Sequence, residues 1–201
     1  PETGKVIFTL SGTYPSDQTV FLSFDDRLYS STDGGLQWSS LPLMPVSPTY
    51  LRTSPHYSTD HTIFLASNAG GIYCSTNGGL NWQNITGTLS TNIYGLEISS
   101  GYPDQPTLFA YDDGGFARSD NGGDSWIHPG GKIINTPGII FRLSSSNPVD
   151  HTLFYISAGS SGGGVYRSQD GAATWQDVSY WNYFWGFMTG LAISPQFGTD
   201  H

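Results

Sequence analysis

One short phrase occurs four times in this chain of 201 residues and constrains its fold more than any other feature. Each copy reads Ser-x-Asp/Asn-Gly-Gly/Ala-x-x-Trp, and its third position recurs at intervals of 44, 44 and 49 residues. The copies place at their first, third, fifth and eighth positions Ser31, Asp33, Gly35 and Trp38; Ser75, Asn77, Gly79 and Trp82; Ser119, Asn121, Gly123 and Trp126; and Ser168, Asp170, Ala172 and Trp175. A period in this range indicates an array of equivalent structural units.

The chemistry of the phrase is that of a turn. An Asp or Asn side chain accepts hydrogen bonds from backbone amides just ahead of it, so either residue closes the turn. Glycine adopts a positive φ without steric cost, and the Trp carries a large apolar side chain into the next strand. We therefore interpret these residues as structural. Because Ala172 stands where the other copies have glycine, we expect the fourth turn to be less tight.

A second phrase precedes each copy of the first and ends in Thr followed by apolar residues. It begins at Tyr14, Tyr57, Tyr102 and Asn147, and a fifth copy begins at Phe197. Together the two phrases predict four strands per unit, with no helical periodicity of useful length. The first strand is expected at 6–10, 95–99 and 190–194, and the third at 27–30, 71–74, 115–118 and 164–167. The second strand is apolar throughout, which predicts burial on both faces.

These phrases resemble Asp-box repeats, also called bacterial neuraminidase repeats, and the match extends over the whole chain. The resemblance implies an all-β fold, a β-propeller of four-stranded antiparallel blades, with the box as the hairpin between the third and fourth strands. It implies blades at residues 5–46, 47–90, 91–134 and 135–185 and the start of a fifth at 186–201. Four blades can close into a ring. The partial fifth unit favours a single propeller that is part of a larger ring.

Composition argues against several partners. The chain has 7 basic and 16 acidic residues, a formal net charge of −9 and no basic patch, so we expect neither nucleic acid nor an anionic membrane surface as a partner. No apolar run approaches the ~18 residues of a membrane-spanning helix. The single cysteine, Cys74, permits no intrachain disulfide. The histidines that follow the turn Asp recur with the fold, and we expect no metal and no cofactor.

An aromatic segment at 180–187 is the first candidate binding site, because six of its eight residues are aromatic. Exposed aromatic clusters mark interaction sites, so Tyr180, Trp181, Tyr183 and Trp185 are candidate ligand-binding residues for a sugar ring or a partner protein. Alternatively, the same rings fill the mouth of the channel or pack between blades. The sequence leaves both interpretations open.

Two carboxylate pairs, Asp25–Asp26 and Asp112–Asp113, are the candidates for catalysis. The resembling family includes sialidases and xyloglucan-cleaving enzymes, and two carboxylates on one face suit glycoside hydrolysis. Both pairs occupy one position of the repeat, beside Gly or Arg in a tight turn, so turn chemistry also explains them. The Arg-Ile-Pro phrase of sialidases is absent.

We therefore predict a non-catalytic extracellular or cell-surface β-propeller that acts as a structural scaffold or binds a protein or glycan partner. Further blades or subunits of a larger assembly are additional candidate partners. Two alternatives stay open: a secreted glycoside hydrolase that uses the Asp carboxylates on a polysaccharide, and an intracellular assembly factor. Fold-level resemblance does not decide among them.

Overall fold

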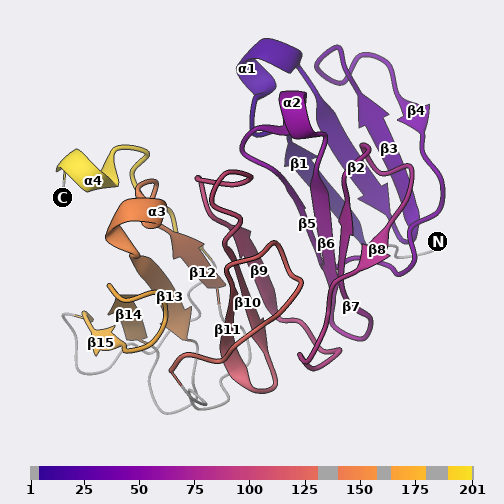
Figure 1. The fold of residues 1–201 in the computed structure, drawn as a ribbon. Helices are drawn as coiled ribbons and strands as arrows, with labels where there is room; N and C mark the ends of the chain where they lie inside the picture. The colour runs from indigo at the N-terminus through magenta and orange to yellow at the C-terminus, as the bar shows by residue number, and fades with distance from the viewer. Residues whose placement is uncertain (1–4, 131–139, 158–163, 180–189, 201) are drawn as a thin grey trace.

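The computed structural model describes residues 5–130, 140–157, 164–179 and 190–200. These residues form an all-β fold of the β-propeller type, in which four antiparallel sheets follow one another along the chain (Figure 1). Within each sheet the strands lie side by side in chain order. No helix of the described residues is long and apolar enough to cross a membrane.

Three of the sheets have four strands each. The first contains β1 (Val6–Leu10), β2 (Val20–Phe24), β3 (Arg27–Ser31) and β4 (Ser39–Ser40). The second contains β5 (Tyr50–Thr53), β6 (Ile63–Ser67), β7 (Gly71–Ser75) and β8 (Gln83–Asn84). The fourth contains β12 (Ile140–Leu143), β13 (Leu153–Ser157), β14 (Gly164–Ser168) and β15 (Gln176–Asp177).

The third sheet has three strands, β9 (Gly95–Ile98), β10 (Leu108–Asp112) and β11 (Gly115–Ser119). A single bridge between Arg118 and Ile127 takes the place of its fourth strand. The second strands β6 and β10 are buried along their whole length, as their apolar sequences predict. The first strands β5, β9 and β12 contact one another in sequence order, and β5 also contacts β1, so the first strands form the inner edge of the arc.

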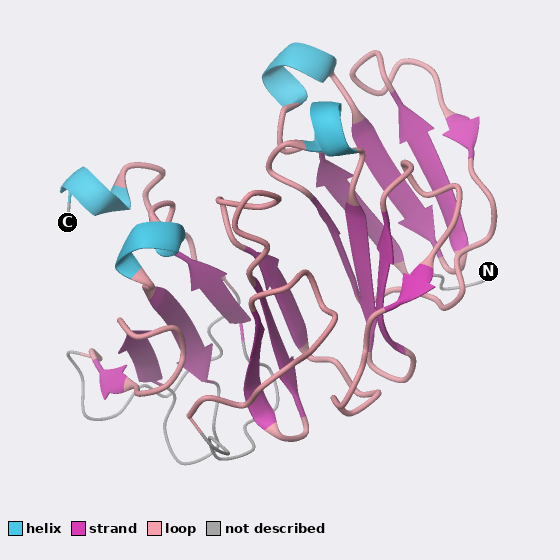
Figure 2. Ribbon diagram, in the orientation of Figure 1, coloured by secondary structure: helices cyan, strands magenta, loops and turns pink. Residues whose placement is uncertain are grey.

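Four helices of one turn each interrupt this pattern: α1 (Tyr14–Asp17), α2 (Tyr57–Asp60), α3 (Asn147–Asp150) and α4 (Phe197–Asp200). Figure 2 shows them all at one end of the sheets. The sequence predicted plain turns there, because one helical turn is too short to show a periodicity. In α1 the carboxylate of Asp17 explains the geometry. It accepts hydrogen bonds from Ser11 Oγ, Thr13 Oγ1 and the Thr19 amide at 2.6 to 2.9 Å.

The repeated Ser-x-Asp/Asn turn is closed by two side chains. In the first copy Ser31 Oγ donates to Asp33 Oδ1 at 2.8 Å and accepts from the Gly35 amide at 2.9 Å. Asp33 Oδ1 also accepts from the amides of Leu36 and Gln37 at 3.0 and 2.9 Å. Only one side-chain oxygen is used in these bonds, and an amide oxygen serves as well as a carboxylate oxygen. Asn77 and Asn121 accept the equivalent serine and backbone bonds at 2.9 Å.

The fourth turn keeps this geometry, contrary to the expectation from its alanine. The amide of Ala172 donates to Ser168 Oγ at 3.0 Å, as the glycine amides do in the other copies. Ala172 adopts a positive φ of 75° to make this bond, a conformation that glycine reaches without strain. The bond and the complete burial of Ala172 hold the turn in place.

Three of the four turn tryptophans, Trp82, Trp126 and Trp175, face the sheet that precedes their own. Trp126 is 7% exposed, and its Nε1 donates to the Ile85 carbonyl of the second sheet at 2.8 Å. Trp175 packs on Phe116 of the third sheet with ring centroids 4.5 Å apart. Trp38 is instead 40% exposed, because no earlier sheet lies against the first one among the described residues.

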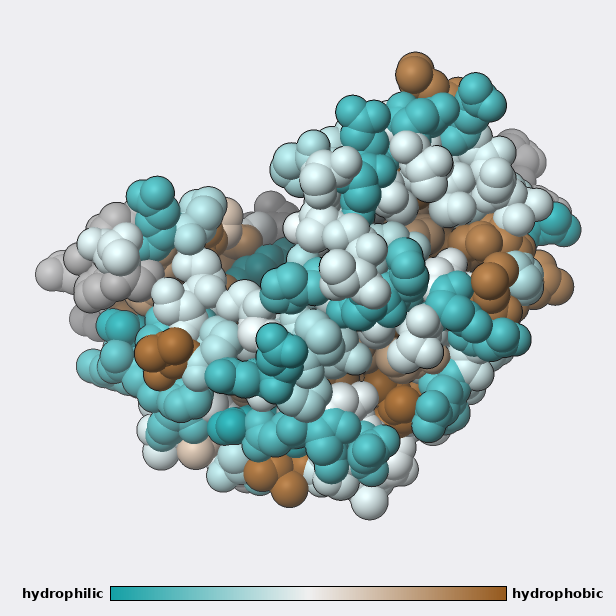
Figure 3. All heavy atoms as spheres, turned by 45° about the horizontal axis from the view of Figure 1, so that its top comes forward, coloured by the Kyte–Doolittle hydropathy of each residue, from teal (hydrophilic) through white to brown (hydrophobic). Residues whose placement is uncertain are grey.

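One of the two faces of strand β1 is apolar and exposed to solvent. Val6, Phe8 and Leu10 alternate along the strand and are 57%, 58% and 44% exposed. Hydrophobic atoms are also visible at the right of Figure 3, the side of the first sheet. The matching residue of the second sheet, Leu51, is fully buried against the first sheet.

The strand predicted at 190–194 is absent: residues 190–194 are described and form no strand. The physical reason is pairing. Every first strand in this structure is hydrogen-bonded to the second strand of its own sheet, as β1 is to β2. Among the described residues no second strand of this unit is present to pair with 190–194.

The two turn carboxylates lead to a prediction about acid stability. Hydrogen bonds from the Gln37 amide and then from Ser31 lower the pKa of Asp33 below its usual 3.8. Partial burial raises the pKa of Asp170, but the bonds from Thr174 and Ser168 together outweigh it and lower that pKa below 3.8. A lowered folded-state pKa gives stability that is present above the unfolded pKa and is lost as the pH falls through the folded pKa.

We expect the Tm of the double variant Asp33→Asn/Asp170→Asn to fall less than the Tm of the parent chain when the pH is lowered from 5 to 2.5. At pH 7 its Tm should stay within a few degrees of the parent value, because Asn77 and Asn121 already close the same turn. Calorimetry at both pH values checks this. An unchanged fall in Tm on acidification would show that these carboxylates do not contribute to acid unfolding.

Candidate functional site

A row of charged side chains crosses the inner strands of three successive sheets. Arg52, Glu97 and Arg142 stand at the same register position of β5, β9 and β12, and each is 45 residues from the next. Glu97 Oε1 accepts from Arg52 Nη2 at 3.2 Å and from Arg142 Nη1 at 2.8 Å. One carboxylate oxygen therefore joins three sheets of the arc.

A cavity of about 180 Å³ lies beside this row and is lined by all three charged residues. Its other walls are mostly apolar and include Tyr50, Leu96, Ile140 and Phe141. Glu97 is the most buried of the three charged side chains, while those of Arg52 and Arg142 are partly exposed. The guanidinium groups are therefore the parts of the row that a solute can reach.

Tyr50 fixes one end of the cavity. Its hydroxyl donates to the backbone carbonyl of Tyr94, and the guanidinium of Arg52 lies 5.9 Å from the centre of its ring. Burial raises the pKa of Tyr50. The side chain thus stays neutral at physiological pH and acts as a hydrogen-bonded wall.

Gly95 keeps the cavity floor compact. A Cβ at this position would lie 2.4 Å from Cε1 of Phe141, closer than real contacts allow. Phe141 is itself buried against Phe116, with ring centroids 5.3 Å apart. Only glycine lets β9 and the Phe141 ring approach this closely.

The charge of the row determines what it can recognise. Two guanidinium groups around one carboxylate leave one net positive charge in a chain whose formal net charge is −9. Arginine presents five N–H donors in a planar fork that matches carboxylate and phosphate groups. The row and its cavity can therefore hold one anionic group next to an apolar wall.

The carboxylate pair Asp112–Asp113 is brought together with polar side chains of neighbouring loops. Asp112 is 2% exposed; its Oδ1 accepts from the Gly114 amide at 2.8 Å, and His128 Nε2 lies 2.9 Å from the same oxygen. Its Oδ2 accepts from the Ser90 amide at 2.8 Å. Both oxygens of Asp112 are thus held inside the loop and are withdrawn from solvent.

Asp113 is exposed, and three donors surround it. Ser90 Oγ, Asn92 Nδ2 and the Tyr94 hydroxyl donate to its carboxylate at 2.5, 2.9 and 2.9 Å. The bond to Asp113 raises the pKa of Tyr94. These contacts tie the segment before β9 to the β10–β11 turn.

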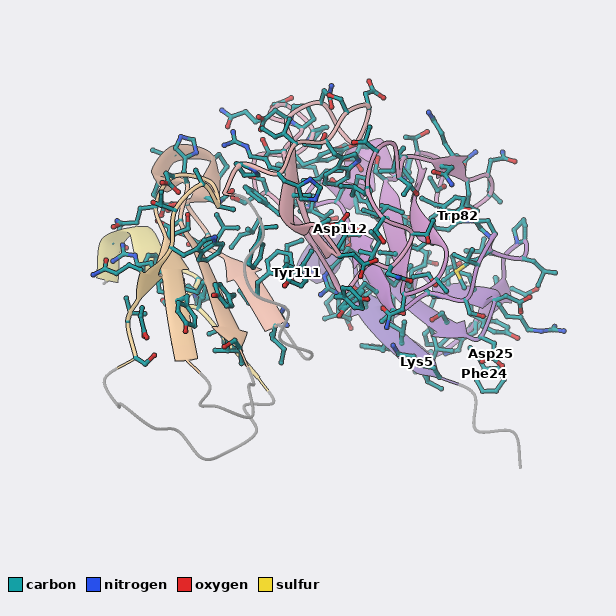
Figure 4. All side chains as sticks on the ribbon, turned by 90° about the horizontal axis from the view of Figure 1, so that it is seen from below. Lys5, Phe24, Asp25, Trp82, Tyr111 and Asp112 are labelled. Atoms are coloured by element: carbon teal, nitrogen blue, oxygen red, sulfur yellow. The ribbon has the colours of Figure 1, made fainter. Side chains whose placement is uncertain are left out.

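The other predicted pair lies apart from this one. Asp25 and Asp26 form the turn between β2 and β3, where Asp25 has a positive φ of 52° and is exposed. Figure 4 shows Asp25 at the edge of the first sheet, far along the arc from Asp112 in the third. The structure therefore does not bring the two pairs to a common site.

The aromatic segment with Tyr180, Trp181, Tyr183 and Trp185 lies outside the described residues. Within the described ranges, no group of three or more His, Cys, Asp or Glu side chains is arranged to hold a metal ion. Cys74 is partly buried against the core, and burial raises the pKa of its thiol to about 12.

The charged row was missed at the sequence level, although the signal was present. First strands were predicted at 6–10 and 95–99 but not at 50–53 and 140–143, so the three charges were not placed on equivalent strands. Alignment of the first strands on the serine that follows them, at Ser54, Ser99 and Ser144, places the three charges in one column. No such periodic signal links His128 to Asp112.

No protein-family model matches this sequence, and no curated protein sequence matches it either. Solved structures, in contrast, share its fold. A GH74 enzyme from Niastella koreensis is 19% identical with a TM-score of 0.63, over 86% of this chain and 29% of that one. The GH74 xyloglucanase from Xanthomonas campestris is 14% identical with a TM-score of 0.64, over 86% and 30%.

YCF48 from Cyanidioschyzon merolae is 18% identical with a TM-score of 0.52, over 80% of this chain and 55% of that one. The chain thus spans about a third or less of the two GH74 proteins and about half of YCF48. Identities this low show the fold alone. The chain has the β-propeller fold of these proteins, and what it binds must be argued from its own residues.

Proposed function

We propose that this chain belongs to a non-catalytic, extracellular or cell-surface β-propeller that acts as a scaffold and binds a partner protein. The binding site is the cavity beside Arg52, Glu97 and Arg142, and the group it receives is a carboxylate of the partner. The observation that carries the proposal is the pair of partly exposed guanidinium groups fixed on one Glu97 oxygen.

The arrangement suits recognition because it is preorganised. Arg52 Nη1 also donates to the Leu51 carbonyl at 3.2 Å, and Arg142 Nη1 donates to the Phe141 carbonyl at 2.8 Å. The two side chains are held by these bonds before any ligand arrives. Fixed donors lose less conformational entropy on binding than free ones, which raises affinity.

The hydrolase alternative has weaker support from the same geometry. Asp112 is buried and bonded on both oxygens, Asp113 accepts three hydrogen bonds, and Asp25–Asp26 lies on another sheet. The GH74 neighbours share the fold with this chain at identities of 19% and 14%, which does not carry their activity over. The assembly-factor alternative also involves a protein partner and differs in location.

The test uses a hexaglutamate peptide as the probe and isothermal titration at about 50 mM salt. Arg142→Gln should weaken peptide binding about tenfold, equivalent to ~1.4 kcal/mol, because it removes one guanidinium from the cavity wall. Arg27→Gln, a matched change on the exposed start of β3, should leave binding unchanged. Affinity should also fall as salt is raised.

Equal binding by the Arg142→Gln and parent proteins would overturn the proposed site. Stronger binding of a neutral xyloglucan oligosaccharide than of the peptide would replace the protein partner with a glycan. Hydrolysis of a polysaccharide that is lost in Asp113→Asn would refute the non-catalytic assignment.

A further inference from the structure

From the second repeat on, one residue of each repeat inserts at the joint between its own unit and the preceding sheet. It stands at the start of the turn after the first strand, where its amide donates to the carbonyl of a serine three residues earlier. The N···O distances are 3.3 Å for Tyr57, 3.0 Å for Tyr102, 3.0 Å for Asn147 and 3.1 Å for Phe197. Tyr14 of the first repeat makes the same bond at 3.1 Å, so the five residues are structural equivalents.

Three of the four joints are filled by an aromatic ring that packs edge-on against a phenylalanine of the preceding second strand. Ring centroids are 5.3 Å apart for Tyr57 and Phe21, 5.4 Å for Tyr102 and Phe64, and 5.4 Å for Phe197 and Phe154. The interplanar angles are 78°, 87° and 84°. Edge-to-face packing at these distances is a favoured aromatic geometry.

The joint between the third and fourth sheets has the phenylalanine of the second strand but no inserted aromatic ring opposite it. Phe109 occupies the position of Phe21, Phe64 and Phe154, but the inserted residue is Asn147. Asn147 is 2% exposed, and its Nδ2 donates to the Thr152 carbonyl of its own sheet at 3.0 Å. Its side chain is therefore engaged within the fourth sheet.

A cavity of about 270 Å³ lies at this joint. It is bounded by α3 on one side and by the end of the β9–β10 segment on the other, two parts that face each other in Figure 1. Its walls include the apolar side chains of Pro106, Phe109 and Pro148. The remaining walls are polar, and by volume alone a cavity of ~150 Å³ is large enough to hold a benzene ring.

The polar wall of the cavity is electrically neutral. Arg118 Nε donates to Asp120 Oδ1 at 2.7 Å, so the two charges are paired. The Arg118 guanidinium lies 6.0 Å from the centre of the Phe109 ring. In the next joint Arg167 lies 5.7 Å from both Phe154 and Phe197, between the two rings. Arg118 stands at the same position of the repeat as Arg167. It thus has one aromatic neighbour where Arg167 has two.

We propose that this cavity is a binding site for one neutral aromatic ring, supplied by a tyrosine or phenylalanine side chain of a partner protein. The ring stacks on the Arg118 guanidinium as Phe197 does on Arg167, above the buried Phe109. A polypeptide ring is the matched occupant, because polypeptide rings fill the three sister joints. A neutral ring is favoured over an ion, because Arg118 is already paired.

The probe is p-cresol, which carries the ring and hydroxyl of a tyrosine side chain. Titration followed by NMR should give saturable shifts at Arg118 and His151, which line the cavity. Asn147→Tyr should fill the cavity from within, raise the Tm and weaken p-cresol binding about tenfold or more. Asn147→Ser, which leaves the cavity open, should lower the Tm and keep binding.

Arg118→Leu provides a second test that does not depend on the folding of Asn147→Tyr, and it should weaken binding by removing the stacking partner. A short peptide, acetyl-Gly-Tyr-Gly-amide, should compete with p-cresol if the site takes a ring on a polypeptide. Failure of the peptide to compete would refute the protein source. Absence of saturable p-cresol binding to the parent chain, or equal binding by Asn147→Tyr, would overturn the site itself.

Discussion

Replacement of Phe116 by alanine should lower the free energy of unfolding by about 3–5 kcal/mol, the range for a large aromatic lost from a packed core. Phe116 is 1% exposed and contacts four aromatic rings, with centroid distances of 4.5 to 5.3 Å. The four rings are Tyr111, Phe141, Tyr155 and Trp175. They belong to the third and fourth sheets, so the substitution opens a void in the joint between them.

Urea unfolding followed by far-UV circular dichroism measures this loss. The matched control is Phe8→Ala, which removes the same side chain from an exposed position on β1 and should cost less than ~1 kcal/mol. A loss below ~1 kcal/mol for Phe116→Ala would show that the third and fourth sheets do not pack as described.

Gly95→Ala should lower the free energy of unfolding by about 1–3 kcal/mol through overpacking. The added Cβ would lie 2.4 Å from Cε1 and 3.0 Å from Cδ1 of Phe141, a ring that is 2% exposed and cannot move into solvent. Gly190→Ala is the matched control, because Gly190 holds the equivalent position of the partial fifth repeat and a Cβ there meets nothing within 4 Å. It should change stability by less than ~0.5 kcal/mol.

A double-mutant cycle links these two predictions. Phe116→Ala creates space beside Phe141, into which that ring can shift when Gly95→Ala pushes it. The double variant should therefore lose less stability than the sum of the two single losses, as is usual for residues that share a contact. Strict additivity would contradict the shared packing of Gly95, Phe141 and Phe116.

The repeat predicts much of the fold because its turns carry their own chemistry. The bonds at Ser31 and Asp33 involve neighbours within a few residues, so one phrase suffices to infer the turn and the two strands around it. Val6–Leu10 and the buried second strands follow from the same reasoning. These features are local, and local features are readable from a single sequence.

The parts that could not be predicted depend on contacts between units. Trp38 and Trp126 have the same motif position, yet one is 40% and the other 7% exposed, because within the described part of the chain only Trp126 has a preceding sheet to pack on. The loss of an aromatic ring at Asn147 is visible in the sequence, but its meaning depends on Phe109 lying opposite. Asp112 and His128 meet across loops whose spacing carries no signal.

We propose above that Arg52, Glu97 and Arg142 form a preorganised site for a carboxylate at the inner edge of the propeller. A crystal structure of the chain grown with the hexaglutamate peptide tests it most directly. We expect both arginines to remain on Glu97 Oε1, with a peptide carboxylate bound to their guanidinium groups in the adjacent cavity. A peptide bound elsewhere, or arginines turned away from Glu97 while the cavity stays empty, would contradict the claim.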